Sequence, residues 1–135
     1  MKKIRIIFDY QIKSFSEFVK ECDCIECIYF IKFFRNNITN KGSMCESCKY
    51  MKEVDLSKFK TDNVTDMKNM FSLCESIKDL NLYNFNTEKV IDLSNMFYFC
   101  KSLKELNISK FKTNNVCYMN KMFSYCEKLE DLKQF

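Results

Sequence analysis

The chain has 135 residues, 47% hydrophobic and 30% charged, a balance typical of a folded domain and not of a disordered segment. It contains no His, no Pro and one Gly, so the usual general base and any glycine-rich phosphate loop are missing. The net charge of +4 is spread along the chain without a basic block. We therefore expect no enzymatic activity, no cofactor and no nucleic-acid partner, and with a single glycine we expect few left-handed turns.

Residues 1–11 are expected to form an N-terminal cap strand, with Ile4 and Ile7 on apolar sites. The segment begins with basic residues, but only four apolar residues precede Asp9, too few for the core of a signal peptide. No stretch approaches the length of a membrane span, so we expect no membrane insertion. The chain as it stands is expected to be cytoplasmic.

From residue 12 onwards the sequence repeats with a period of 26 residues. The clearest copies are VTDMKNMFSLCESIKDLNLYNFNTEK at 64–89 and VIDLSNMFYFCKSLKELNISKFKTNN at 90–115, and an incomplete copy occupies 116–135. Apolar spacing carries the same register back through two earlier units, in which few residues are identical: 38–63, where Lys41 is the misfit, and 12–37. A period of this length predicts a solenoid over residues 12–135.

Each unit changes its apolar spacing halfway. Ile77, Leu80 and Leu82 give L-x-x-L-x-L, which predicts the short inner strand of a leucine-rich repeat. A Thr suited to a helix N-cap follows, as at Thr61, and leads into helical offsets at Val64, Met67, Met70, Phe71 and Cys74. We therefore expect an α/β, leucine-rich-repeat-like solenoid of short parallel strands and short helices. Because strands stack about 4.8 Å apart and helices about 8 to 10 Å, the strands should line its concave side.

A family resemblance is carried by NVTDMKNMF, SLCESIKDLNLYNFNT, SNMFYFCKSLKELNISKFKT and NKMFSYCEKLEDL. The chain resembles the BspA-like leucine-rich repeat surface proteins, of the DUF285 type, over 49–132 and less closely over 12–48. The resemblance implies a repeat fold used on cell surfaces for adhesion or protein contact, without enzymatic activity. The chain departs from the family in lacking an export signal, and in having Leu73, Phe99 and Tyr125 where Gly is favoured. These residues predict a different turn or a longer helix.

Nine cysteines are present, and five recur at the full period: Cys22, Cys48, Cys74, Cys100 and Cys126. In a solenoid they would form one inner column. We interpret them as reduced thiols that fill a small core site. A disulfide between neighbouring coils is an alternative that only an oxidising compartment would favour.

Two CxxC pairs, Cys24 with Cys27 and Cys45 with Cys48, are separated by a spacing that suits a four-cysteine zinc site. A zinc-binding N-terminal module with a nucleic-acid or protein partner is therefore the alternative function. The repeat register argues against it, because Cys48 belongs to the inner column and Cys45 occupies the site of Phe71. We expect no metal.

The strand face carries two polar columns. The first is acidic, and either the neighbouring Lys52, Lys78 and Lys104 neutralise it, which we favour, or it meets a basic partner or a divalent cation. The second could hydrogen-bond an extended peptide. By analogy with the fold, the expected site for a protein or peptide partner comprises Glu53, Asp55, Asp79, Asn81, Tyr83, Glu105, Asn107 and Asp131.

The last unit stops inside its strand, at residue 135. A solenoid that ends there exposes an unpaired strand edge and an apolar face. We expect either end-to-end association of the molecule or a longer protein of which this chain is a piece.

Overall fold

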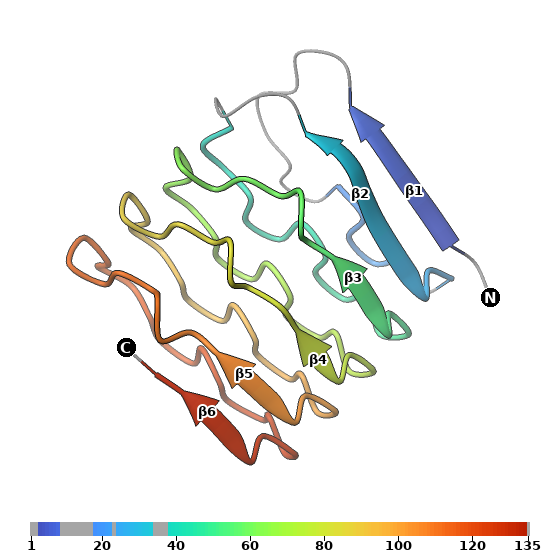
Figure 1. Ribbon diagram of the computed structural model, residues 1–135. Coiled ribbons are helices and arrows are strands. Elements are labelled where there is room, and N and C mark those ends of the chain that lie inside the picture. Colours follow the sequence, from blue (N-terminus) through green and yellow to red (C-terminus); the bar gives the residue numbers. More distant parts are fainter. Residues whose placement is uncertain (1–2, 9–17, 23, 34–37, 135) are drawn as a thin grey trace.

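The computed structural model describes residues 3–8, 18–22, 24–33 and 38–134 (Figure 1). Within these residues the chain winds into stacked coils, and every coil contributes one short strand to the same side of the molecule (Figure 1). The strands form two parallel sheets, in the orders β1-β2-β3 and β4-β5-β6. Their bounds are β1 Lys3–Phe8, β2 Cys27–Phe33, β3 Glu53–Asp55, β4 Asp79–Leu80, β5 Glu105–Asn107 and β6 Asp131–Lys133.

Neighbouring coils are held in a register of 26 residues on both sides of the stack. On the strand side, Glu105 of β5 pairs with Asp79 of β4 and with Asp131 of β6. On the opposite side, single parallel bridges join Asp66 to Asp92 and Asp92 to Tyr118. One turn of the solenoid is therefore one sequence repeat, which confirms the predicted leucine-rich-repeat-like architecture of short parallel strands.

The predicted helices are wrong for the residues that the structure describes, which contain strands, bridges and turns but no helix. In place of i to i−4 bonds, the N–H groups of alternate residues donate to the next coil. Met67 donates to the carbonyl of Asp92, at 3.0 Å, and Leu73 donates to that of Tyr98, at 2.7 Å. The apolar spacing of this segment arises from its packing against the core, and the segment is a turn-rich coil. Accordingly, no helix able to cross a membrane is found in this part of the chain.

Left-handed backbone is common here despite the single glycine. Nine non-glycine residues within the described segments have positive φ, whereas Gly42 does not. The expectation of few left-handed turns is therefore wrong. Leu73, Phe99 and Tyr125 have φ of 60° to 62°, so the turn before each column cysteine keeps the conformation that Gly would favour. Gly42 is needed for space, since a Cβ there would lie 3.1 Å from both the Asp66 carboxylate and the Lys68 carbonyl oxygen.

The space between the two sides is filled by a continuous apolar core. Phe71, Phe97 and Phe123 stack with centroids 6.1 and 5.7 Å apart and interplanar angles of 5° and 4°. Parallel stacking at one coil spacing is the direct result of placing the same residue at the same site in successive coils. Lys41 is the exception in this core, because its side chain is fully buried at the site that Met67 occupies one coil later.

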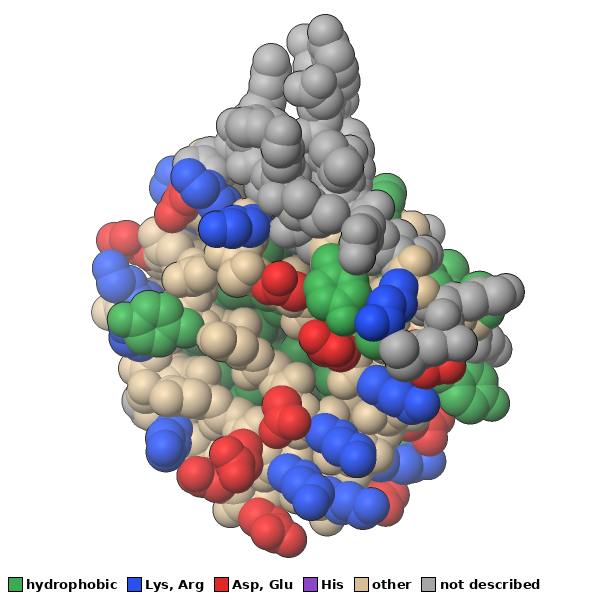
Figure 2. Space-filling model, turned by 45° about the vertical axis from the view of Figure 1, so that its right-hand side comes forward, with side chains coloured by type: hydrophobic (Ala, Val, Ile, Leu, Met, Phe, Trp, Pro, Cys, Tyr) green, Lys and Arg blue, Asp and Glu red, His purple; other side chains and the backbone are tan. Residues whose placement is uncertain are grey.

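The expected cause of curvature is also absent from the described coils. We expected the strand side to be concave because helices require wider spacing than strands. Here both sides are joined by coil-to-coil backbone hydrogen bonds of similar length, so neither side must be wider. Figure 2, in which the strand side comes forward, shows acidic and basic side chains together over this face.

Candidate functional site

The recurring cysteines form an inner column, as predicted, and have a second role that the sequence did not reveal. Each thiol donates to a carbonyl oxygen of the preceding coil. The bonds run from Cys48 to Val19 at 2.8 Å, from Cys74 to Cys45 at 3.1 Å, from Cys100 to Phe71 at 3.1 Å and from Cys126 to Phe97 at 3.0 Å. All are free thiols. Burial raises the pKa of Cys74 and Cys100 well above the usual value, so these sulfurs are protonated and unreactive.

The four cysteines of the zinc alternative do not come together. Cys45 and Cys48 are buried in the core, whereas Cys24 is exposed. Cys27 is buried beside Glu53, with its thiol 3.9 Å from the carboxylate. Within the described residues, no three His, Cys, Asp or Glu side chains are grouped so that they could hold a metal ion. The structure therefore gives the alternative no ligand set.

A groove of about 340 Å³ lies on the strand side, over β4, β5 and β6. It brings together six of the eight residues of the predicted site: Asp79, Asn81, Tyr83, Glu105, Asn107 and Asp131. The other two, Glu53 and Asp55, lie on β3, outside the groove. Sequence reasoning missed Lys110 and Lys133 in the groove wall. The only signal for them is their position in the repeat, immediately beside the polar columns.

The middle polar column shapes its own backbone. The side-chain oxygen of Asn81 accepts the N–H of Tyr83 at 3.0 Å, and that of Asn107 accepts the N–H of Ser109 at 3.1 Å. Asp55 makes the same turn one coil earlier. Such turns fix the end of each strand and occupy the oxygen atom. The amide nitrogens of Asn81 and Asn107, both exposed residues, are left as donors for a ligand.

The acidic column is not neutralised in the way we expected. Lys52 pairs with Glu26 at 3.1 Å, because its side chain lies beside the same site of the neighbouring coil and not beside Glu53. Asp131 pairs with Lys133 at 3.9 Å. In the part of the chain that the structure describes, no ion pair joins Lys78 or Lys104 to the column, and none is made by Asp79 or Glu105. Both carboxylates are exposed on adjacent strands.

The N-terminal member of the column is occupied differently. The hydroxyl of Tyr29 donates to the Glu53 carboxylate at 3.1 Å. Desolvation and this hydrogen bond raise the pKa of Tyr29 to about 12, so the phenol stays a donor at all ordinary pH values. Glu53 is therefore satisfied within the chain, in contrast to Asp79 and Glu105.

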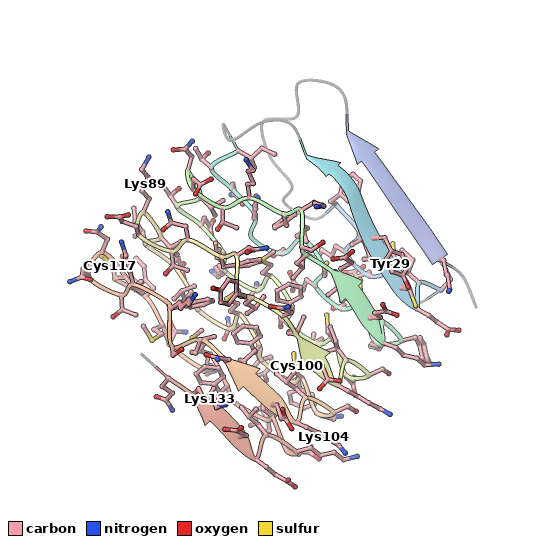
Figure 3. The ribbon with its side chains drawn as sticks, in the orientation of Figure 1. Tyr29, Lys89, Cys100, Lys104, Cys117 and Lys133 are labelled. Carbon is pink, nitrogen blue, oxygen red and sulfur yellow. The ribbon has the colours of Figure 1, made fainter. Side chains whose placement is uncertain are left out.

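The opposite end of the groove is basic. The Lys110 ammonium lies 3.4 Å from the centre of the Tyr83 ring. Its hydrogen bond to the Tyr83 side chain, and then its charge, lower the pKa of that phenol. Tyr83 is 67% exposed, so this pair stands as a wall above the strand surface. Lys133 and Lys104 also lie on the strand side, whereas Cys117 lies at the edge away from it (Figure 3).

Two comparisons with known proteins agree with this fold. The family described as "Mycoplasma protein of unknown function, DUF285" matches residues 11–135. The crystal structure of a leucine-rich repeat protein from Bacteroides ovatus ATCC 8483 is similar, with a TM-score of 0.63 and 18% identity. The match covers 97% of this chain and 33% of that one, so the chain spans about a third of its length. No curated protein matches the sequence. The chain belongs to the DUF285 family and has a leucine-rich-repeat-like fold.

Proposed function

We propose that the chain is a non-enzymatic protein-interaction or adhesion scaffold, which binds an extended peptide segment of a partner on its strand side. The observation that carries this proposal is the groove over β4 to β6, lined by exposed polar residues. Its floor is fixed by coil-to-coil hydrogen bonds and by the side-chain turns of Asn81 and Asn107. A rigid floor loses little entropy when a ligand binds.

The chemistry of the groove supports binding over catalysis. Its titratable side chains are carboxylates, lysines and one phenol, and none is paired as a nucleophile with an adjacent base. The column thiols nearby are buried, protonated and bonded to carbonyl oxygens. Exposed Asn, Tyr and carboxylate groups in a groove suit hydrogen bonding to an extended backbone and its side chains.

The proposal is tested by selecting peptides from a random library displayed on phage and measuring the dissociation constants of the selected sequences. The double variant Glu105→Ala/Tyr83→Ala removes two exposed groove residues, and we expect binding to weaken by about tenfold or more, as for removal of interface anchors. The matched control is Glu88→Ala/Tyr118→Ala, which removes the same residue types at exposed positions outside the groove. Equal affinities for both double variants would show that the strand side is not the binding surface.

A further inference from the structure

The two ends of the groove have opposite charge. At the start of β4 and β5, Asp79 and Glu105 are exposed, lie side by side in register, and make no ion pair within the described residues. At the other end, Lys110 lies against the Tyr83 ring and likewise makes no ion pair with a described residue. Charges that the chain itself leaves unpaired are available to a ligand.

We propose that the groove selects an extended peptide with a basic group at one end and a carboxylate about four residues away. This inference rests on the proposed function, because it specifies the ligand of the same groove. The basic group of the peptide lies at Asp79 and Glu105. The peptide carboxylate lies at the Lys110 ammonium, and its backbone carbonyls accept the amide N–H groups of Asn81 and Asn107.

The spacing of the two poles fixes the length of the ligand. Four residues separate Asp79 from Tyr83 along the strand direction, which at about 3.3 Å per residue corresponds to at most about 13 Å. An extended peptide covers the same distance with about four residues. Asn81 lies midway, where the peptide backbone would pass.

The two poles also exclude other ligands. A peptide that is basic throughout meets the Lys110 ammonium, and one that is acidic throughout meets the two carboxylates, so each suffers repulsion at one end. Lys133 and Asp131 pair with each other at 3.9 Å, which cancels most of their effect on a ligand. Selectivity therefore depends on the β4 and β5 end of the groove and on Lys110.

The test uses four fluorescent five-residue peptides with blocked termini and alanine at the remaining positions. One has Arg first and Asp last, one has Arg at both ends, one has Asp at both ends, and one is all alanine. We expect the Arg-to-Asp peptide to bind the chain at least about tenfold more tightly than the other three, which corresponds to about 1.4 kcal/mol. Fluorescence anisotropy gives the dissociation constants.

Reversal of one pole decides the question. Lys110→Glu makes both ends acidic, so the peptide with Arg at both ends should become the tightest ligand. Lys68→Glu makes the same charge change at an exposed lysine outside the groove and should leave the order of affinities unchanged. Circular dichroism and urea midpoints establish that both variants keep the fold.

The outcomes separate this inference from the proposed function. If the phage-selected peptides depend on Glu105 and Tyr83 but Lys110→Glu leaves the order of the four peptides unchanged, the charge pattern is wrong and the binding surface stands. If neither the selected nor the synthetic peptides are weakened by Glu105→Ala/Tyr83→Ala, both proposals fall.

Discussion

The thiol of Cys100 donates a hydrogen bond of 3.1 Å to the carbonyl oxygen of Phe71, which lies in the preceding coil, 29 residues earlier. Both groups are buried. The same bond recurs at Cys74 and Cys126, so the column cysteines link successive coils as well as fill the core. Serine and alanine each lack part of this combination, since serine is more polar and alanine has no donor.

Replacement of the thiol should therefore destabilise the fold. Cys100→Ala removes the donor for the Phe71 carbonyl and leaves a small cavity, and we expect the free energy of unfolding to fall by about 1 to 3 kcal/mol. Cys117→Ala is the control, because Cys117 is exposed, and should change stability by less than about 0.5 kcal/mol. Urea unfolding under reducing conditions measures both. Equal losses for the two variants would show that the buried bond adds nothing.

Alkylation should separate the cysteines into two classes. Cys24 and Cys117 are exposed and should react with iodoacetamide in the folded chain. Cys45, Cys74 and Cys100 are buried, and burial raises the pKa of each thiol, so almost no thiolate is present at pH 8. Mass spectrometry of peptides should show their modification only after unfolding in urea. Modification of Cys74 at the rate of Cys117 would contradict the buried column.

The repeat and its strands could be predicted from the sequence because both follow from the same fact. A period of 26 residues places Leu80 under Leu106, and the L-x-x-L-x-L spacing identifies the inward positions of the strand. The helices could not be excluded from one unit alone. Met67, Met70 and Phe71 have helical spacing, but their segment takes its hydrogen bonds from the next coil, and that non-local pairing overrides local preference.

The site was predictable only in part, for a related reason. Asp79, Asn81 and Glu105 are adjacent in the repeat, so their place on one face followed from the register. The proximity of Lys110 to Tyr83 depends on how side chains from two coils lean across the groove, which the repeat pattern does not specify. The pairing of Lys52 with Glu26 in place of Glu53 has the same origin, because a long side chain reaches either neighbouring coil.

Left-handed positions should respond to glycine in the opposite way from ordinary ones. Lys121 is exposed with φ of 56°, a conformation that costs a non-glycine residue about 1 to 2 kcal/mol. We expect Lys121→Gly to stabilise the chain by about 0.5 kcal/mol and Lys121→Val to destabilise it by about 1 to 2 kcal/mol. Lys128 is exposed without positive φ, so Lys128→Gly should destabilise, and thermal unfolding compares the three. Destabilisation by Lys121→Gly as large as that by Lys128→Gly would argue against the left-handed turn.

Lys41 should make stability depend on pH. Its ammonium bonds to the Lys60 carbonyl oxygen and lies 3.6 Å from the centre of the Phe59 ring. Burial lowers the pKa of Lys41 from 10.5 to about 7, and the opposing effect of the Asp62 carboxylate is smaller. Between pH 7 and 10.5 the unfolded chain therefore binds more protons than the folded chain. The contribution of Lys41 to stability must rise with pH across this window and be level below it.

Lys41→Met tests this directly, since Met occupies the same site in the next coil. The variant should be more stable than the natural chain at pH 6 by about 1 to 4 kcal/mol, because it buries no charge. The difference between the two proteins should shrink by about 3 to 5 kcal/mol between pH 6 and pH 10, at 1.36 kcal/mol per pKa unit. The buried thiols, whose raised pKa values lower stability at alkaline pH, are common to both proteins and cancel. A difference that stays constant over this range would mean that Lys41 keeps an ordinary pKa in the folded chain.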